Sequence, residues 1–289
     1  MAFVANSLSN LPVTSGAIFF VDSGASNSAD GNVGRDPSKP MATIDAAIGR
    51  CTANKGDMIV VMPGHDENPL VSITMDVAGV WIYGLGWGAS RPTVTFGATA
   101  ATLSITAASC RVSGIVFDLG TVATTVTDAI NITGADCIIE NCETVPHATS
   151  QFTNFLTSST AALRLTIRGN RFRGLGAASG TSGLVLVGCH DLNMHDNEIS
   201  GGFSTGAVTQ TTTATRVSIW NNRIVNDSAF YALDVADATT GLIMGNLMGA
   251  GSALTAVIDF GATWGAENYA VDVADGTVNA TIQPKTAPT

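Results

Sequence analysis

Hydrophobic and polar residues alternate in short segments along most of the chain, with the two-residue period of β-strands. In the first half, this alternation predicts strands over residues 80–84, 94–96, 103–105 and 112–117. In the second half, it predicts strands over residues 184–187, 207–209, 231–234 and 256–259. Turn residues separate these segments, so the pattern indicates an all-β protein built from many short strands.

One short motif occurs five times between Cys137 and Met248: an apolar residue, two variable residues, Asn, a variable residue and usually another apolar residue. The asparagines lie 29, 27, 25 and 24 residues apart, at Asn141, Asn170, Asn197, Asn222 and Asn246. These intervals predict one motif per coil of a parallel β-solenoid. Because stacked coils repeat about every 4.8 Å, the asparagines are expected to form a buried, hydrogen-bonded ladder. The alternative is an antiparallel β-sandwich with accidental Asn spacing.

One segment near the N-terminus has helical rather than strand periodicity. Ile44, Ala47, Ile48 and Cys51 occupy positions i, i+3, i+4 and i+7, which predicts a short amphipathic helix over about residues 43–52. A helix at this place would cover the open end of the first coil. The expected organisation is an N-terminal arm, the β-helix with its capping helix, and a C-terminal strand with a polar tail, over residues 1–16, 17–265 and 266–289.

Three N-terminal segments carry a family resemblance: residues 20–23 (FVDS), 36–48 (DPSKPMATIDAAI) and 56–64 (GDMIVVMPG). They resemble the N-terminal capping segment of right-handed parallel β-helix proteins of the pectate-lyase-like superfamily, in the form common in bacteriophage virion proteins. With the Asn repeats, the resemblance extends from residue 17 to about residue 250. It implies a right-handed, single-stranded parallel β-helix. It does not select an activity, because that superfamily contains lyases, hydrolases, tailspikes and inert structural proteins.

The composition bears on the partners of the chain. Of its 289 residues, 45% are hydrophobic and 12% are charged, with a net charge of −10. So few charges predict that much of the lateral surface is buried against other copies or another protein. The negative charge argues against nucleic acid, and the absence of an 18-residue apolar run argues against a membrane partner. Without a secretory signal, synthesis in the host cytoplasm is expected, with five free cysteines.

Aligning the motifs on their asparagines places outward residues in columns. One column contains Cys142, Arg171, Glu198, Arg223 and Leu247, and another contains Ile139, Arg168, His195, Trp220 and Met244. In the first, Arg171, Glu198 and Arg223 predict a solvent-facing ion ladder, with a lyase-like arginine beside an acid as the alternative. In the second, Arg168, His195 and Trp220 predict an exposed strip. Such a strip suits a subunit interface or a surface that stacks on a sugar ring.

Two pairs of carboxylates are the candidates for catalysis, because glycoside hydrolysis needs two carboxylates about 5–10 Å apart. Asp196 and Glu198 flank a predicted bend, and Asp234 and Asp259 lie in equivalent strands one coil apart. Neither pair is assigned a catalytic role. His65, Asp66 and Glu67 suit a polar capping turn or a metal site, and the turn is preferred. Pectate-lyase-type chemistry needs clustered acids for calcium, and acids are sparse, so no metal or cofactor is expected.

The sequence as a whole favours a structural function. We expect a bacteriophage virion protein, such as a capsid decoration protein, head fibre or tail-spike body, that stabilises the particle or attaches it to a surface. The expected partners are further copies of the chain in a homotrimer, capsid or tail proteins, and a host-surface glycan. The three-fold state is implied by the resemblance to phage spikes and decoration proteins. The alternatives are a polysaccharide lyase or hydrolase, acting as a depolymerase, and a non-catalytic glycan-binding β-helix.

Overall fold

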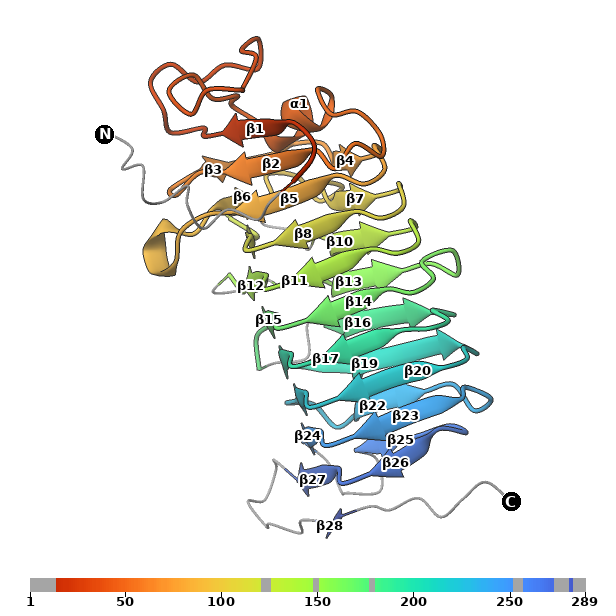
Figure 1. Cartoon of the computed structure of the whole chain (residues 1–289). Coiled ribbons are helices and arrows are strands. Elements are labelled where there is room, and N and C mark those ends of the chain that lie inside the picture. The colour runs from red at the N-terminus through yellow and green to blue at the C-terminus, as the bar shows by residue number, and fades with distance from the viewer. Residues whose placement is uncertain are drawn as a thin grey trace.

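The computed structural model of the protein describes residues 14–120, 126–147, 151–176, 180–251, 257–272 and 281–282. The predicted N-terminal arm therefore lies outside the described residues except for residues 14–16, and so does most of the predicted C-terminal tail. The described chain is a stack of β-coils that runs from β1 (Ile18–Val21) at one end to β27 (Tyr269–Asp272) at the other (Figure 1). No helix within the described ranges is long and apolar enough to cross a membrane.

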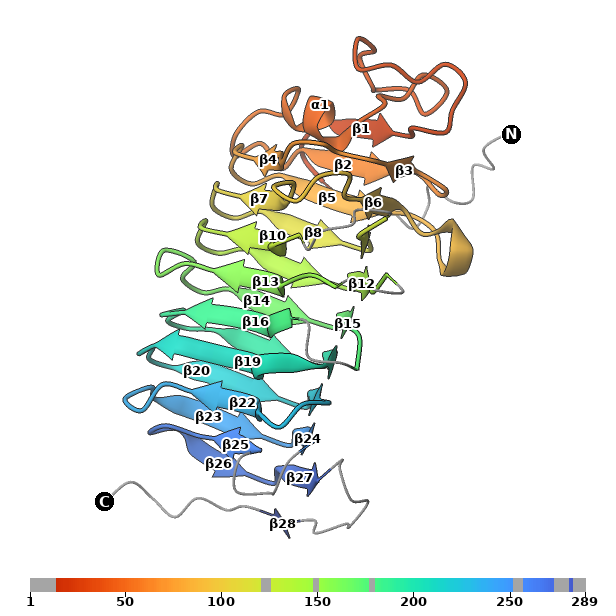
Figure 2. The ribbon, with the colours of Figure 1, turned by 180° about the vertical axis from the view of Figure 1, so that it is seen from behind.

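Three long sheets, named A, B and C here, form the sides of the stack, as the two opposite views show (Figures 1 and 2). Sheet A contains β1, β2 (Met58–Val61), β5 (Trp81–Gly84), β8 (Arg111–Ser113), β11 (Ile138–Glu140), β14 (Thr166–Arg168), β17 (Asn193–His195), β20 (Val217–Trp220), β23 (Gly241–Met244) and β26 (Trp264–Ala266). Sheet B contains β3 (Asp66–Glu67), β6 (Thr93–Thr95), β9 (Val116–Asp118), β12 (Glu143–Val145), β15 (Arg171–Arg173), β18 (Glu198–Gly201), β21 (Arg223–Asn226), β24 (Leu247–Ala250), β27 and β28 (Thr281–Ile282). Sheet C contains β4 (Ile73–Met75), β7 (Leu103–Ile105), β10 (Asp128–Ile132), β13 (Asn154–Ser158), β16 (Gly180–Val187), β19 (Phe203–Thr212), β22 (Tyr231–Val235) and β25 (Ile258–Asp259).

The chain visits the sheets in the fixed order A, B, C, and repeats this order eight times between β2 and β25. Neighbouring strands in each sheet are parallel, and among the described strands only β27 and β28 pair antiparallel. This arrangement is a parallel β-solenoid, so the predicted all-β fold is confirmed and the sandwich alternative is wrong. The predicted final strand is β27, which continues sheet B.

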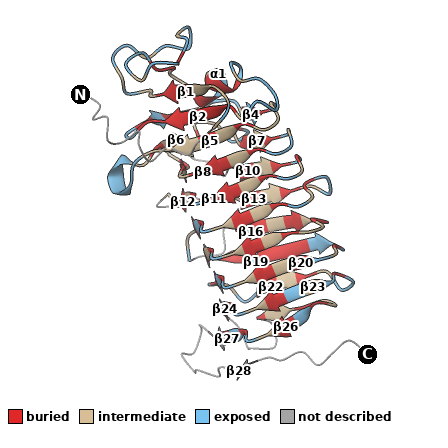
Figure 3. Cartoon of the chain, viewed as in Figure 1, coloured by how far each residue is buried: buried red, intermediate tan, exposed pale blue. Residues whose placement is uncertain are grey.

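The core runs the full length of the stack because each coil places the same positions inward. On sheet A the register aligns one buried apolar residue per coil, as in Val112, Ile139, Ile167, Met194, Ile219 and Ile243. Figure 3 shows this buried interior along the strands. Under sheets B and C, six buried phenylalanines contact one another in series: Phe96, Phe117, Phe152, Phe155, Phe172 and Phe203. Continuous burial of this kind is the main source of stability in a solenoid.

A short helix, α1 (Ile44–Ile48), lies against the first coil and buries Ile44, Ala47 and Ile48. It is shorter than the predicted range of about 43–52, because the chain leaves the helical path after Gly49 in a turn that ends at Cys51. Thr43 caps it, since its hydroxyl oxygen accepts the N–H of Ala46 at 3.2 Å.

The segment His65–Glu67 joins the cap to the first coils. The N–H of Ser23 donates to His65 Nδ1 at 2.9 Å, and the N–H of Ile44 donates to Glu67 Oε2 at 2.9 Å. Because His65 Nδ1 accepts, the ring proton is on Nε2, which lies 3.3 Å from Glu67 Oε2. Both side chains are buried, so this group acts as the polar capping turn that the sequence favoured.

Candidate functional site

The corner between sheets A and B has a regular construction that positions the outward side chains. In successive coils the last strand residue of sheet A is followed by a residue with φ between +53° and +77°, namely Gly114, Asn141, Gly169, Asp196, Asn221, Gly245 and Glu267. The next residue points inward and begins the path to sheet B. This left-handed residue turns the chain sharply, and Gly, Asn and Asp tolerate that conformation best.

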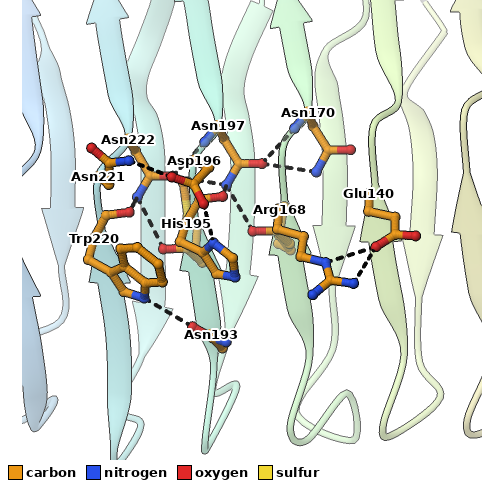
Figure 4. A network of polar contacts seen from close by, with 12 residues as sticks. Glu140, Arg168, Asn170, Asn193, His195, Asp196, Asn197, Trp220, Asn221 and Asn222 are labelled. Atoms are coloured by element: carbon orange, nitrogen blue, oxygen red, sulfur yellow. Dashed lines mark hydrogen bonds and ion pairs between the residues drawn. The ribbon is translucent and has the colours of Figure 1, made fainter.

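The inward residue of this corner forms the asparagine ladder. The Nδ2 of Asn170, Asn197, Asn222 and Asn246 each donates at 2.9 Å to the Oδ1 of the ladder asparagine in the following coil, the last being Asn268. The same Oδ1 atoms also accept the backbone N–H of the preceding asparagine at 2.9–3.1 Å. Figure 4 shows three successive rungs. The five ladder asparagines are all buried.

The prediction for Asn141 is wrong. Asn141 is exposed and has φ of +53°, because it occupies the left-handed position that precedes the ladder residue. Its inward neighbour is Cys142, whose N–H donates to Asn170 Oδ1 at 2.9 Å. The ladder thus begins at Asn170, and Asn268 is the rung that the motif search missed.

Correcting this register changes the outward columns in the same coil. Glu140, not Ile139, is the sheet A neighbour of Arg168, and Glu143, not Cys142, is the sheet B neighbour of Arg171. The corrected column on sheet A contains Tyr83, Ser113, Glu140, Arg168, His195 and Trp220. A second outward column beside it begins with Trp81, Arg111 and Ile138.

Six residues of these columns form the floor of an open groove of about 820 Å³, which we call the sheet A groove: Trp81, Tyr83, Arg111, Ser113, Glu140 and Arg168. Its wall is the loop of residues 85–92, a long connection at a corner that is tight in the following coils, with a 3₁₀ turn at Gly88–Ser90. Trp87 on this loop is 87% exposed. The charged lining consists of four arginines and two glutamates: Arg91, Arg111, Arg168, Arg171, Glu140 and Glu143. The groove therefore carries a local positive excess on a chain whose net charge is −10.

Glu140 organises the floor of the sheet A groove. Its side chain is 5% exposed and lies between two guanidinium groups. Arg111 Nε donates to Oε1 at 2.7 Å and Arg168 Nε donates to Oε2 at 2.8 Å, and the Nη2 of each arginine forms a further bond to the same oxygen. Arg111 also lies over the ring of Trp81, with its Cζ atom 3.9 Å from the ring centroid. Both arginines are thus held in fixed positions, with their remaining N–H groups available to a ligand.

Arg91 fixes the wall of the groove to the coils below it. Its Nη1 donates to Glu143 Oε2 and its Nη2 to the carbonyl oxygen of Asn141, both at 2.7 Å. This contact places Trp87 beside a second groove of about 660 Å³ on the outer face of sheet B, which we call the sheet B groove. Thr93, Val116, Asp118 and Val145 line it together with residues of the loop.

The predicted ion ladder lies at the edge of this region. The carboxylate of Glu198 accepts hydrogen bonds from Arg171 Nε at 2.9 Å and from Arg223 Nη1 at 3.1 Å. The bond from Arg171 lowers the pKa of the Glu198 carboxyl, with further help from nearby arginines. Asp196 is the left-handed corner residue of its coil, and bonds from His195 and Asn221 lower the pKa of its carboxyl. Two carboxyls with lowered pKa values are poor proton donors at neutral pH, so this pair does not suit a glycosidase acid.

One outward column contains Arg168, His195 and Trp220, but these side chains make different contacts. Arg168 belongs to the sheet A groove through Glu140, whereas His195 and Trp220 stack on each other with centroids 4.3 Å apart and planes 8° apart. His195 also bonds Asp196 at 2.7 Å, and Trp220 Nε1 donates to Asn193 at 3.3 Å (Figure 4).

Asp234 and Asp259 are register partners in β22 and β25 on sheet C, away from the sheets that carry the two grooves. Burial raises the pKa of the Asp234 carboxyl, and the charges of Asp259 and Asp237 raise it further. Adjacent parallel strands lie about 4.8 Å apart, close to the carboxyl separation of retaining glycosidases. None of the grooves described above includes either residue. Among the described residues, no group of three or more His, Cys, Asp or Glu is arranged to hold a metal ion.

Comparison with known proteins adds information on the fold. No protein-family model matches the chain, and no curated protein sequence matches it. Among solved structures, pectate lyase Pel9A is similar over 92% of this chain and 78% of its own, with 12% identity and a TM-score of 0.41. A rhamnogalacturonan lyase is similar over 89% of this chain and 68% of its own, with 13% identity and a TM-score of 0.33. The parallel β-solenoid is established by the strand pairing of the chain itself, and these likenesses assign no activity to it.

Proposed function

We propose that the protein binds an acidic polysaccharide through the sheet A groove, as a recognition surface without chemistry of its own. The observation that carries this proposal is the arrangement of Arg111, Glu140 and Arg168, in which one buried carboxylate fixes two guanidinium groups at an open groove. Arginine forks bind carboxylates through paired hydrogen bonds, and the exposed ring of Trp87 offers an apolar face to a sugar.

Binding is favoured over catalysis by the state of the acids in the groove. Glu140 and Glu143 are the carboxylates that line it, and both are engaged in ion pairs with arginines. A general base must present a free carboxylate oxygen to the substrate, and both carboxylate oxygens of Glu140 are occupied by guanidinium groups. The polysaccharide lyase and the hydrolase are therefore the alternatives that the experiment must separate from binding.

Replacing Arg111 by glutamine is expected to weaken the binding of acidic oligosaccharides about 10- to 100-fold, because a charge-assisted hydrogen bond contributes about 1.5–3 kcal/mol. Trp87→Ala is expected to act in the same direction, since its exposed ring has little structural role. Arg216→Gln is the matched control: Arg216 is an exposed arginine, paired with Asp191 outside the groove. Isothermal titration calorimetry with uronate oligosaccharides, and with neutral dextran, measures these effects.

Two results would contradict this proposal. Equal loss in Arg111→Gln and Arg216→Gln would mean that charge alone, and not the groove, attracts the ligand. Shortening of the polysaccharide by the wild-type protein, detected as new reducing ends and abolished in Glu140→Gln, would replace binding with depolymerase activity.

For the setting of this binding, we propose a bacteriophage virion, with the chain as a homotrimeric surface component attached to capsid or tail proteins. The N-terminal resemblance supports the virion. An exposed apolar patch on the last coils supports self-association, because Leu242 and Trp264 are register partners on sheet A and Leu247 and Tyr269 on sheet B. Patches of this kind on a β-rich surface are typical of protein interfaces.

The assembly is tested by light scattering on the purified protein. We expect a mass three times 29.5 kDa, and a shift toward the single-chain mass when Trp264 is replaced by glutamate. Trp87→Glu, the same change at a more exposed tryptophan outside the patch, is the control and is expected to leave the mass unchanged. A mass of a single chain for the wild type, without co-sedimentation with phage particles, contradicts this setting.

A further inference from the structure

The sheet A groove and the sheet B groove share part of their lining. Trp87, Arg91, Glu143 and Arg171 line both. The shared residues lie at the corner between the two sheets, where Arg91 ties the loop of residues 85–92 down to Glu143. We infer that the two grooves form one continuous site, in which an acidic polysaccharide crosses the corner past Arg171 from sheet A to sheet B. This inference rests on the proposed function.

The charges of the two grooves differ and so define the ligand further. Four arginines oppose two glutamates in the sheet A groove. In the sheet B groove, Arg91 and Arg171 are balanced by Asp118 and Glu143, and Thr93, Val116 and Val145 complete the wall. An anionic sugar is therefore favoured on sheet A, whereas a balanced, partly apolar groove favours an uncharged one. The ligand class is a heteropolysaccharide that contains both acidic and neutral sugars.

A lengthwise path along sheet A is the other direction open to a long ligand, and it leads from Arg168 to His195 and Trp220. The aromatic rings on that path are partly covered. His195 covers one face of Trp220 in a parallel stack at 4.3 Å, and Met244 is the register partner of Trp220 on the next strand. A stacking platform for sugars needs an accessible ring, and Trp87 is 87% exposed whereas Trp220 is half-buried with His195 stacked on it. The crossing is thus the better supported direction.

The experiment fills the sheet B groove and leaves the sheet A groove intact. Val116 is half-buried on the outer face of β9, so Val116→Trp projects an indole into the sheet B groove. Val145→Trp does the same from β12 and serves as a second variant. Calorimetry with oligosaccharides of alternating uronate and N-acetylhexosamine, from the disaccharide to the octasaccharide, measures affinity as a function of length.

For the wild type, we expect affinity to rise with ligand length. In either filled variant, the increase in affinity from the shortest to the longest ligand should be about tenfold smaller than in the wild type. The affinity for the shortest ligand should stay unchanged. Trp220→Ala is expected to behave as the wild type. The inference is overturned if both filled variants keep the full gain, or if Trp220→Ala removes it, which would indicate the lengthwise path. Absence of wild-type binding to every acidic ligand overturns the proposed function itself, a result distinct from either of these.

Discussion

Replacing Asn197 by leucine is expected to lower the free energy of unfolding by about 3–5 kcal/mol, because several buried polar groups lose their partners together. Asn197 Oδ1 accepts the backbone N–H of Asn170 at 3.0 Å and the Nδ2 of Asn170 at 2.9 Å. Its own Nδ2 donates to the carbonyl oxygens of Ile167 at 2.8 Å and His195 at 2.9 Å. Leucine has a similar volume and none of these groups, so the loss is polar rather than steric.

Urea denaturation followed by circular dichroism measures this change. The control is Asn131→Leu, the same chemical change at a half-buried residue on the outer face of sheet C, where we expect an effect within about 0.5 kcal/mol. If Asn197→Leu unfolds at the same urea concentration as the wild type, the ladder contributes nothing to stability and its assigned role is wrong.

Replacing Gln210 by leucine is expected to change stability in the opposite direction to Asn197→Leu. It should raise the free energy of unfolding by about 1–3 kcal/mol. Gln210 is buried in β19, and its register partners in the flanking coils are Leu186 and Val235, which are also buried. Neither its amide nitrogen nor its amide oxygen has a hydrogen-bond partner among the residues that the structure describes. The native amide thus costs stability that an apolar side chain of similar size does not.

The same denaturation experiment tests Gln210, with Gln210→Glu as the comparison. Glutamate keeps the shape and adds a charge to the same apolar position, so we expect it to destabilise the protein. Loss of stability in Gln210→Leu would show that the amide is satisfied in solution and would contradict this prediction.

The coil architecture could be predicted from sequence because the inward positions are strictly periodic. The asparagines at 170, 197, 222 and 246 each follow an alternating apolar strand, and the structure places all four in one ladder. The motif did not identify Asn268, because the position three residues before it, where the motif has a large apolar residue, is occupied by Gly265. The hydrogen-bonding requirement at the corner keeps Asn there even where the strand pattern weakens.

The error at Asn141 has an identifiable physical cause. Ile138 and Ile139 are both apolar, so the strand pattern fits either of two registers one residue apart. If Asn141 is taken as the ladder residue, Glu143 falls at an inward position. In the register of the structure, Thr144 occupies that inward position and is fully buried. That polar mismatch was the available signal. Asn suits both the ladder and the left-handed corner, so residue identity alone did not decide.

The groove could not be found from the sequence because it joins coils that contain the motif to coils that lack it. Trp81, Arg111 and Glu140 become neighbours only through the strand register, across intervals of about thirty residues. The alternation around Ile82 and Val112 does assign Trp81, Tyr83 and Arg111 to the outer face. What it leaves open is which coils are adjacent and where the loop of residues 85–92 folds, since these depend on long-range packing.

The turns between the sheets separate the width of the molecule from its height. The intervals between ladder residues fall from 27 to 22 residues between Asn170 and Asn268, yet every coil adds one strand spacing of about 4.8 Å to the stack. Residues are therefore gained or lost at the turns without disturbing the register of the strands, and the loop of residues 85–92 is one such gain. If the groove binds a ligand as proposed, a different loop transplanted into the corner between sheets A and B, or into the same corner of a later coil, is expected to change that ligand while the stack of strands keeps its length. The fold is in this sense a scaffold that accepts changes one turn at a time.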